Sequence, residues 1–159
     1  MADSVMHIGL VQAAAAIDRA ANWERAEEGI RRCAAAGARV VCLQELFTTL
    51  YFAATEDHAA FDWAETIPGP TTEHFAAVAK KLGVVLVLPL FEERAPGLCH
   101  NTAVVLEKDG AIAGIYRKMH IPDDPGFYEK FYFAPGDLGF HAFDTSAGKI
   151  AVLICWDQW

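Results

Sequence analysis

Residues 151–159 read AVLICWDQW, and this stretch guides the interpretation of the whole chain. The apolar run from Ile150 to Ile154 is short and rich in β-branched residues, which predicts a buried strand. Cys155 follows at once, where that strand would end. A thiol at a strand exit can serve as a nucleophile, because the strand fixes its backbone and the next turn can offer N–H groups. Taken alone, the commoner interpretation is a small apolar residue that finishes the strand, since free cysteine is often buried.

Upstream of this strand, apolar runs alternate with amphipathic segments. Asp109-Gly110 between two apolar runs is typical of a hairpin, and Gly37 and Gly83 are suited to end helices. A mixed sheet in an α/β chain is therefore expected, with Glu92–Cys99 as a polar loop. The predicted strands are Met6–Val11, Ala38–Leu43, Val84–Leu88, Thr102–Leu106 and Ala111–Tyr116, and the predicted helices are Ala20–Ala36 and a second one from Thr71 or Thr72 to Leu82.

A long segment, Ile121–Asp137, contains three prolines and two glycines, from which we expect no regular structure. It also contains five aromatic residues, so it must pack on something rather than act as a free linker. It could form a pocket wall, or it could cover a sheet edge. The irregular, aromatic stretch Thr48–Pro70 could line a pocket, or it could be a loop held in place by hydrophobic anchors, which is the commoner case.

Length and composition restrict the function classes. The 159 residues are 53% hydrophobic and carry a net charge of -8, which suits one domain, spanning 1–159, with a real core. The acidic balance argues against a nucleic-acid partner, and no apolar run is long enough for a membrane span. The start, MADSVMHIGL, lacks the pattern of a signal peptide, so we expect a cytoplasmic, reducing location.

The four cysteines are expected to be free thiols. None forms a C-x-x-C pair, and no histidine pair has the spacing of a metal site, so no metal is predicted. Cys33 lies on the apolar stripe of the first predicted helix and Cys42 lies inside a predicted strand, so both are interpreted as core residues. Cys99 is assigned no chemistry.

Three reactive groups each follow a predicted strand: Glu45, Lys118 and Cys155. Each has a plain alternative, since Glu45 and Lys118 could simply reach solvent at a strand end. Neighbouring strands of one sheet would bring the three groups together at one edge. A carboxylate can take the thiol proton, and an ammonium beside the sulfur favours thiolate and stabilises an oxyanion. Attack of a cysteine on an amide or nitrile carbon would follow from this combination.

Three blocks of the sequence resemble the nitrilase (carbon–nitrogen hydrolase) superfamily. The first is QELF at 44–47, the second runs from YRKMHIP at 116–122 through GFYEKFYF at 126–133 to PGD at 135–137, and the third is ICWDQW at 154–159. The resemblance implies a four-layer α-β-β-α sandwich, assembly into homo-oligomers, a small-molecule substrate, and no metal or organic cofactor. Within the superfamily, the blocks are most similar to the branch that hydrolyses the ureido group of a carbamoylated diamine and releases putrescine, CO2 and ammonia.

The resemblance also implies roles for individual residues. Glu45 matches the general base, Lys118 the lysine that stabilises the tetrahedral intermediate, and Cys155 the nucleophile. Glu129 matches a second glutamate beside the lysine, and the N–H of Trp156 is the expected oxyanion donor. Candidate contacts to the far ammonium group of the substrate are Tyr51, Asp123, Asp124 and Tyr128.

The family pattern continues beyond the point at which this sequence stops, four residues after Cys155. We therefore expect only the first portion of the sandwich here, and a 159-residue polypeptide that is inactive or prone to aggregate. Two other functions stay open. One is a different amidase or nitrilase with the same catalytic groups, and the other is a non-catalytic module.

Overall fold

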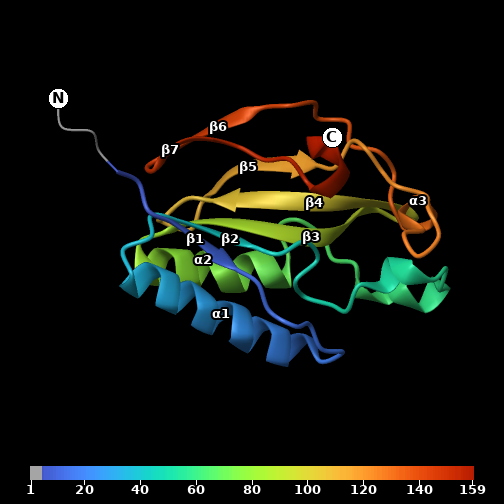
Figure 1. The fold of residues 1–159 in the computed structure, drawn as a ribbon, viewed down its shortest axis with the longest axis horizontal. Coiled ribbons are helices and arrows are strands. Elements are labelled where there is room, and N and C mark those ends of the chain that lie inside the picture. The colour runs from blue at the N-terminus through green and yellow to red at the C-terminus, as the bar shows by residue number, and fades with distance from the viewer. Residues whose placement is uncertain (1–4) are drawn as a thin grey trace.

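A mixed five-stranded sheet forms the centre of the molecule (Figure 1), as seen in a computed structural model that describes residues 5–159. Its strands, in spatial order, are β1 (Ile8–Val11), β2 (Val40–Leu43), β3 (Val85–Ala95), β4 (Leu98–Leu106) and β5 (Ile112–Arg117). The first three are parallel, and β4 and β5 join as antiparallel hairpins. The α/β class and the mixed sheet are thus confirmed. The signal-peptide prediction includes residues 1–4, which lie outside the described residues.

Two helices, α1 (Arg19–Ala35) and α2 (Pro70–Leu82), cover one face of the sheet (Figure 1). The predicted stripe of α1 faces the sheet, with Ala26 and Ile30 buried in the shared core. Gly37, with φ +89°, follows the end of α1, as its conformational freedom predicts. The predicted threonine cap of α2 is wrong. Gly69 precedes the helix and Pro70 opens it, a position at which the missing proline N–H costs nothing.

The opposite face of the sheet is covered by a hairpin of β6 (Ala142–Thr145) and β7 (Gly148–Ala151) (Figure 1). The two sheets approach closely at Gly114, where a Cβ would lie 2.1 Å from the ring of Phe143. Helices, sheet and second sheet form three successive layers, in the order of an α-β-β-α sandwich. The buried strand expected up to Ile154 is corrected, because β7 ends at Ala151 and pairs only with β6.

The first part of β3, Val85–Leu88, is apolar at every position because both of its faces are covered. Leu86 and Leu88 point into the core under the helices, whereas Val85 and Val87 point into the core under the hairpin. A strand that is covered on both faces needs apolar residues at every position. The polar loop predicted at Glu92–Cys99 is wrong, since these residues extend β3 and β4 and leave only Pro96-Gly97 as the turn.

The long loop after β5 packs on an aromatic cluster, as its composition predicts. Phe52, Phe91, Tyr132 and Phe133 are buried together there, and Phe52 stacks on Phe91 with centroids 4.8 Å apart. The expectation of no regular structure is wrong in one place, where a single helical turn, α3 (Glu129–Tyr132), forms between the prolines and glycines. The irregular stretch before α2 likewise contains two short 3₁₀ turns, Phe52–Ala54 and His58–Trp63.

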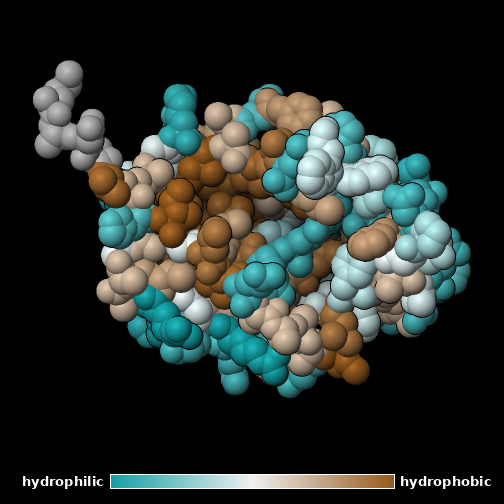
Figure 2. Space-filling model, viewed as in Figure 1, coloured by the Kyte–Doolittle hydropathy of each residue, from teal (hydrophilic) through white to brown (hydrophobic). Residues whose placement is uncertain are grey.

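One part of the surface is conspicuously apolar. Figure 2 shows hydrophobic residues gathered between the β6–β7 hairpin and the helices, in the left half of the view. The edge strand β1 contributes to the exposed apolar surface, since Ile8 is 57% and Leu10 is 77% exposed. Contiguous exposed apolar surface of this kind is typical of a face that another protein surface covers.

Candidate active site

Lys118 directly follows β5, and two backbone hydrogen bonds hold its main chain in place. The N–H of Lys118 donates to the Asn101 carbonyl over 2.8 Å, and its own carbonyl accepts from the Gly136 N–H over 2.8 Å. Glycine is needed at 136, because a Cβ there would lie 2.0 Å from the Arg117 carbonyl oxygen. The β4–β5 ladder thereby continues one residue past β5, and Lys118 starts from a fixed position.

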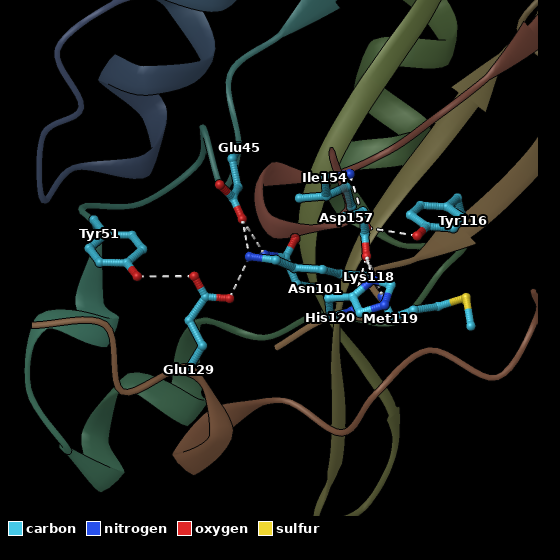
Figure 3. Close-up of polar contacts among 10 residues, drawn as sticks. All are labelled: Glu45, Tyr51, Asn101, Tyr116, Lys118, Met119, His120, Glu129, Ile154 and Asp157. Atoms are coloured by element: carbon cyan, nitrogen blue, oxygen red, sulfur yellow. Dashed lines mark hydrogen bonds and ion pairs between the residues drawn. The ribbon is translucent and has the colours of Figure 1, made fainter. Parts of the chain in front are cut away.

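Two carboxylates hold the buried ammonium group of Lys118 (Figure 3). Its Nζ lies 2.9 Å from Glu45 Oε1 and 2.7 Å from Glu129 Oε2, and the side chain is 0% exposed. Burial acts to lower the pKa of Lys118, but the charges and hydrogen bonds of the two glutamates outweigh it and the pKa is raised. Lys118 is therefore a cation throughout the neutral pH range.

Glu45 lies in the turn that follows β2. Its Oε1 accepts from Lys118 and also from the Asn101 Nδ2 group, 2.7 Å away. The next residue, Leu46, is buried in the aromatic cluster with φ +53°, a left-handed conformation that costs a non-glycine residue about 1–3 kcal/mol. Glu45 thus does more than reach solvent. Its carboxylate is oriented by a strand end, a strained turn and two donors.

Glu129 opens α3 and is almost completely buried. Its Oε2 pairs with Lys118, and its Oε1 accepts from the Tyr51 hydroxyl over 3.0 Å (Figure 3). Burial raises the pKa of Glu129, and the nearby charge of Glu45 raises it further, although Lys118 and Tyr51 act in the opposite direction. Burial and the Glu129 charge likewise raise the pKa of Tyr51, so its hydroxyl stays protonated and donates.

Cys155 begins a 3₁₀ turn, Cys155–Gln158, a few residues after β7. It is exposed, with φ +48°, so the second strained non-glycine residue of residues 5–159 carries the thiol. Burial of part of the thiol and the charge of Glu45 raise its pKa, whereas Lys118 and the Trp156 N–H lower it. The thiol therefore lies within the field of the Glu45–Lys118–Glu129 cluster.

The route by which these groups meet differs from the expectation of neighbouring strands in one sheet. Glu45 and Lys118 follow β2 and β5, which are separated by β3 and β4 but run in the same direction. Their ends therefore lie at the same edge of the five-stranded sheet. Cys155 follows β7, which belongs to the other sheet. The site is assembled between two layers.

The structure distinguishes among the candidate substrate contacts. The Tyr51 hydroxyl is directed at Glu129, so this residue supports the charged cluster. Asp123 and Asp124 are exposed, and neither makes a hydrogen bond or an ion pair with Glu45, Lys118 or Glu129. Tyr128 precedes α3 and donates its backbone N–H to the Ala53 carbonyl.

Two residues that sequence reasoning did not select belong to the site. Asn101 donates to Glu45, and its Oδ1 is buried with no hydrogen-bond partner among residues 5–159. Asp157 is buried within the ICWDQW block and accepts several hydrogen bonds. The available signal for Asn101 was a run of polar residues, His100 to Thr102, directly before the apolar end of β4. A carboxylate two residues after the candidate nucleophile was the signal for Asp157.

Two further findings concern residues 5–159. No helix in this part of the chain is long and apolar enough to cross a membrane. Within the same range, no group of three or more His, Cys, Asp or Glu side chains has the arrangement of a metal site.

Comparison with known proteins gives a consistent result. The carbon-nitrogen hydrolase family matches residues 7–159. An N-carbamoylputrescine amidase from Solanum lycopersicum is 42% identical over 96% of this chain, and a citrullinase from Francisella tularensis is 39% identical over 96%. A crystal structure of a carbon-nitrogen hydrolase from Helicobacter pylori G27 superposes with a TM-score of 0.92, at 48% identity over 97% of this chain.

These matches cover only part of each relative. The chain spans 51% of the tomato amidase, 53% of the citrullinase and 53% of the Helicobacter pylori structure. The similarity therefore covers about half the length of each relative.

Proposed function

Because this chain belongs to the carbon–nitrogen hydrolase family, we propose that it carries the catalytic groups of a cysteine-dependent amidohydrolase. The proposed reaction cleaves the ureido carbon–nitrogen bond of N-carbamoylputrescine, as the name of the tomato relative suggests. The observation that carries the proposal is the buried Lys118 ammonium between Glu45 and Glu129, at 2.9 and 2.7 Å, whose field reaches the Cys155 thiol.

In the first half of the reaction, Glu45 takes the proton of Cys155 and the thiolate sulfur attacks the ureido carbon. Both hydrogen bonds that Glu45 accepts fall on Oε1, so Oε2 is the oxygen available to the thiol proton. The oxyanion that develops is stabilised by the Lys118 ammonium and the Trp156 N–H. The bond to the terminal nitrogen then breaks, and that nitrogen leaves as ammonia with the proton from Glu45.

In the second half, Glu45 takes a proton from water, whose oxygen attacks the thioester carbon. The carbon–sulfur bond breaks and the proton returns to the Cys155 sulfur. The product is the N-carboxylate of putrescine, which loses CO2 to give putrescine. Glu129 does not change its bonds in this scheme. It holds Lys118 and is itself held by Tyr51.

A second candidate substrate is a ureido amino acid, because the citrullinase is similar to this chain over nearly the same range. The ammonium end of putrescine would favour acidic or aromatic contacts, for which Asp123, Asp124 and Tyr128 are the candidates. An α-amino acid end would also require a cation for its carboxylate. A simple amide, cleaved by the same groups, is the remaining enzymatic alternative.

The experiment is a substrate panel on the complete natural protein that contains this sequence. N-carbamoylputrescine, citrulline, a carbamoyl β-amino acid and a simple amide are compared by ammonia release. The proposal expects the highest kcat/KM with N-carbamoylputrescine, and a loss of about 10⁴-fold or more in Cys155→Ser. Preference for citrulline would retain the mechanism and change the substrate. Hydrolysis by Cys155→Ser at an undiminished rate would overturn the mechanism.

The proposal also covers the domain organisation, pathway, cellular location and assembly of the enzyme. We propose a single carbon–nitrogen hydrolase domain, a role in polyamine formation, a cytoplasmic location and assembly with further copies. The exposed apolar surface that includes Ile8 and Leu10 supports a covered face. Size-exclusion chromatography with light scattering tests the assembly, and a monomer at micromolar concentration would contradict it.

A further inference from the structure

The carboxylate of Asp157 is the most heavily hydrogen-bonded side chain beside the nucleophile. It lies two residues after Cys155, and its side chain is 0% exposed. Five contacts reach it from three segments, and Figure 3 shows them converging on one carboxylate. None of the steps of the proposed reaction uses this group.

The two carboxylate oxygens of Asp157 are directed at different parts of the fold. Oδ1 accepts from the Met119 N–H at 3.2 Å, from the His120 N–H at 3.0 Å and contacts His120 Nδ1 at 2.9 Å. Oδ2 accepts from the Ile154 N–H at 3.0 Å and from the Tyr116 hydroxyl at 2.7 Å. One oxygen thus bonds the segment that follows Lys118, and the other bonds the residue that precedes Cys155.

A local role in the turn does not account for this arrangement. A side chain that only caps the 3₁₀ turn would bond the Ile154 N–H and otherwise face solvent. The three contacts of Oδ1 come from residues 37 and 38 positions away in the sequence. They join the turn to the exit of β5, where Lys118 lies between Tyr116 and Met119.

The carboxylate of Asp157 is ionised at neutral pH. Burial acts to raise its pKa, but the hydrogen bonds from Tyr116 and from the His120 and Ile154 N–H groups outweigh burial, so the pKa is lowered. An ionised carboxylate only accepts hydrogen bonds, which matches an environment made of donors.

We propose that Asp157 is a positioning residue that fixes the Cys155 turn onto the segment following Lys118 and so sets the place of the sulfur relative to the ammonium group. The inference rests on the proposed function, because it takes Cys155 as the nucleophile and Lys118 as the stabilising cation. In this arrangement the Asp157 carboxylate bonds both the segment after Lys118 and the turn that carries Cys155.

Asp157→Asn is the variant that tests this most selectively. An amide has one accepting oxygen, and three of the five contacts, two of them backbone N–H groups, come from the side of Met119 and His120. The oxygen is expected to stay there, which places the amide nitrogen opposite the Ile154 N–H. The bond to the nucleophile turn is lost while the shape of the side chain is retained.

The readout is kcat per reactive Cys155 in the complete protein. Reactive thiol is counted by iodoacetamide labelling, with the label located on the Cys155 peptide by mass spectrometry. The inference expects kcat per labelled Cys155 to fall about 10- to 100-fold with KM changed less than about threefold, because small misplacements of reacting groups have effects of this size. If Asp157 only supports folding, the labelled fraction falls and kcat per labelled thiol stays unchanged, which would overturn the inference.

Two further variants control the experiment. Asp62→Asn removes the charge of an exposed aspartate outside the site and is expected to leave both quantities unchanged. Tyr116→Phe removes one donor to Oδ2 but leaves the Ile154 bond, so its loss of kcat should be smaller than that of Asp157→Asn. An equal loss in Tyr116→Phe would contradict the inference. Full activity of Cys155→Ser would instead refute the proposed function, so the two failures are distinguishable.

Discussion

The charged cluster of Glu45, Lys118 and Glu129 and the turn that carries Cys155 are held in different ways. In the cluster, a fully buried ammonium group makes two short ion pairs, and additional donors orient both carboxylates. In the turn, the thiol is exposed at a left-handed residue, and the Asp157 carboxylate joins the turn to β5 and to the residues that follow Lys118. The ammonium group of the cluster is held by direct contacts to its own side chain, whereas the proposed nucleophile is positioned through the backbone of its turn and the Asp157 carboxylate.

This difference suits a reaction in which the groups that stabilise the oxyanion must be in place before its charge develops. Dipoles and ions that are fixed in advance need no reorganisation when the oxyanion forms. A nucleophile must move between a free thiol, a tetrahedral adduct and a thioester, so fewer contacts on Cys155 are compatible with its role.

The largest effect is expected when the central cation is removed. Lys118→Met leaves Glu45 and Glu129 facing each other without a counter-charge, which should lower the free energy of unfolding by about 3–5 kcal/mol. Activity should fall about 10²- to 10³-fold or more, because the oxyanion loses its cation. Urea unfolding and ammonia release measure the two effects.

A second variant separates these effects. Adding Glu129→Gln to Lys118→Met removes one of the two repelling charges, so part of the stability should return while activity stays low. If the double variant regained activity as well, Lys118 would have a structural role alone.

Glu45→Gln tests the coupling between the cluster and the nucleophile. The loss of the general base should reduce kcat about 10²- to 10⁴-fold. The charge of Glu45 raises the pKa of Cys155, so its removal should lower that pKa and move the pH profile of iodoacetamide alkylation to lower pH. An unchanged alkylation profile would show that the thiol lies outside the field of Glu45.

Asn101→Ala tests the orientation of Glu45 alone. The variant removes a 2.7 Å hydrogen bond from a residue that lies inside β4 and is completely buried. We expect kcat to fall about tenfold, with the alkylation profile of Cys155 retained because the charge of Glu45 remains. A loss of protein stability with no change in kcat would contradict this role for Asn101.

The smallest effect is expected from Tyr51→Phe. It deletes the hydroxyl that bonds Glu129 Oε1, worth about 0.5–1.5 kcal/mol, and leaves the Lys118 ion pair. Removing this bond should raise the pKa of Glu129 further, so kcat should fall only a few-fold, mainly at acidic pH where Glu129 begins to protonate. Tyr132→Phe is the matched control, since its hydroxyl donates to the Thr55 backbone carbonyl and makes no hydrogen bond with Glu129, and it should lower Tm without changing the pH profile.

The sequence predicted the fold where a segment's own pattern decides its structure. The helix stripe of α1, the glycines that follow the helices, and the Asp109-Gly110 hairpin were all local signals. The β3–β4 hairpin at Pro96-Gly97 was missed because charged residues in an exposed strand end resemble a loop. The turn α3 was missed because its stability comes from packing on the aromatic cluster rather than from its four residues.

Glu45, Lys118 and Cys155 were selected because each follows a predicted strand, and Glu129 was selected from the family resemblance alone. The partners of those residues were not predicted, because they come from distant segments. Asn101 reaches Glu45 across 56 positions, and Asp157 reaches Met119 across 38. Such pairs become visible only when the register of β4 with β5 and the position of the second sheet are known.

In the proposed reaction, Cys155 forms a covalent intermediate beside Lys118 and Glu45. Rapid-quench mass spectrometry of the complete protein with its preferred substrate from the panel tests it most directly, with Glu45→Gln included because slow water activation should let the intermediate accumulate. We expect one added acyl group of the substrate, located on the Cys155 peptide. An adduct on any other residue, or substrate turnover by a protein that lacks the Cys155 thiol, would contradict it.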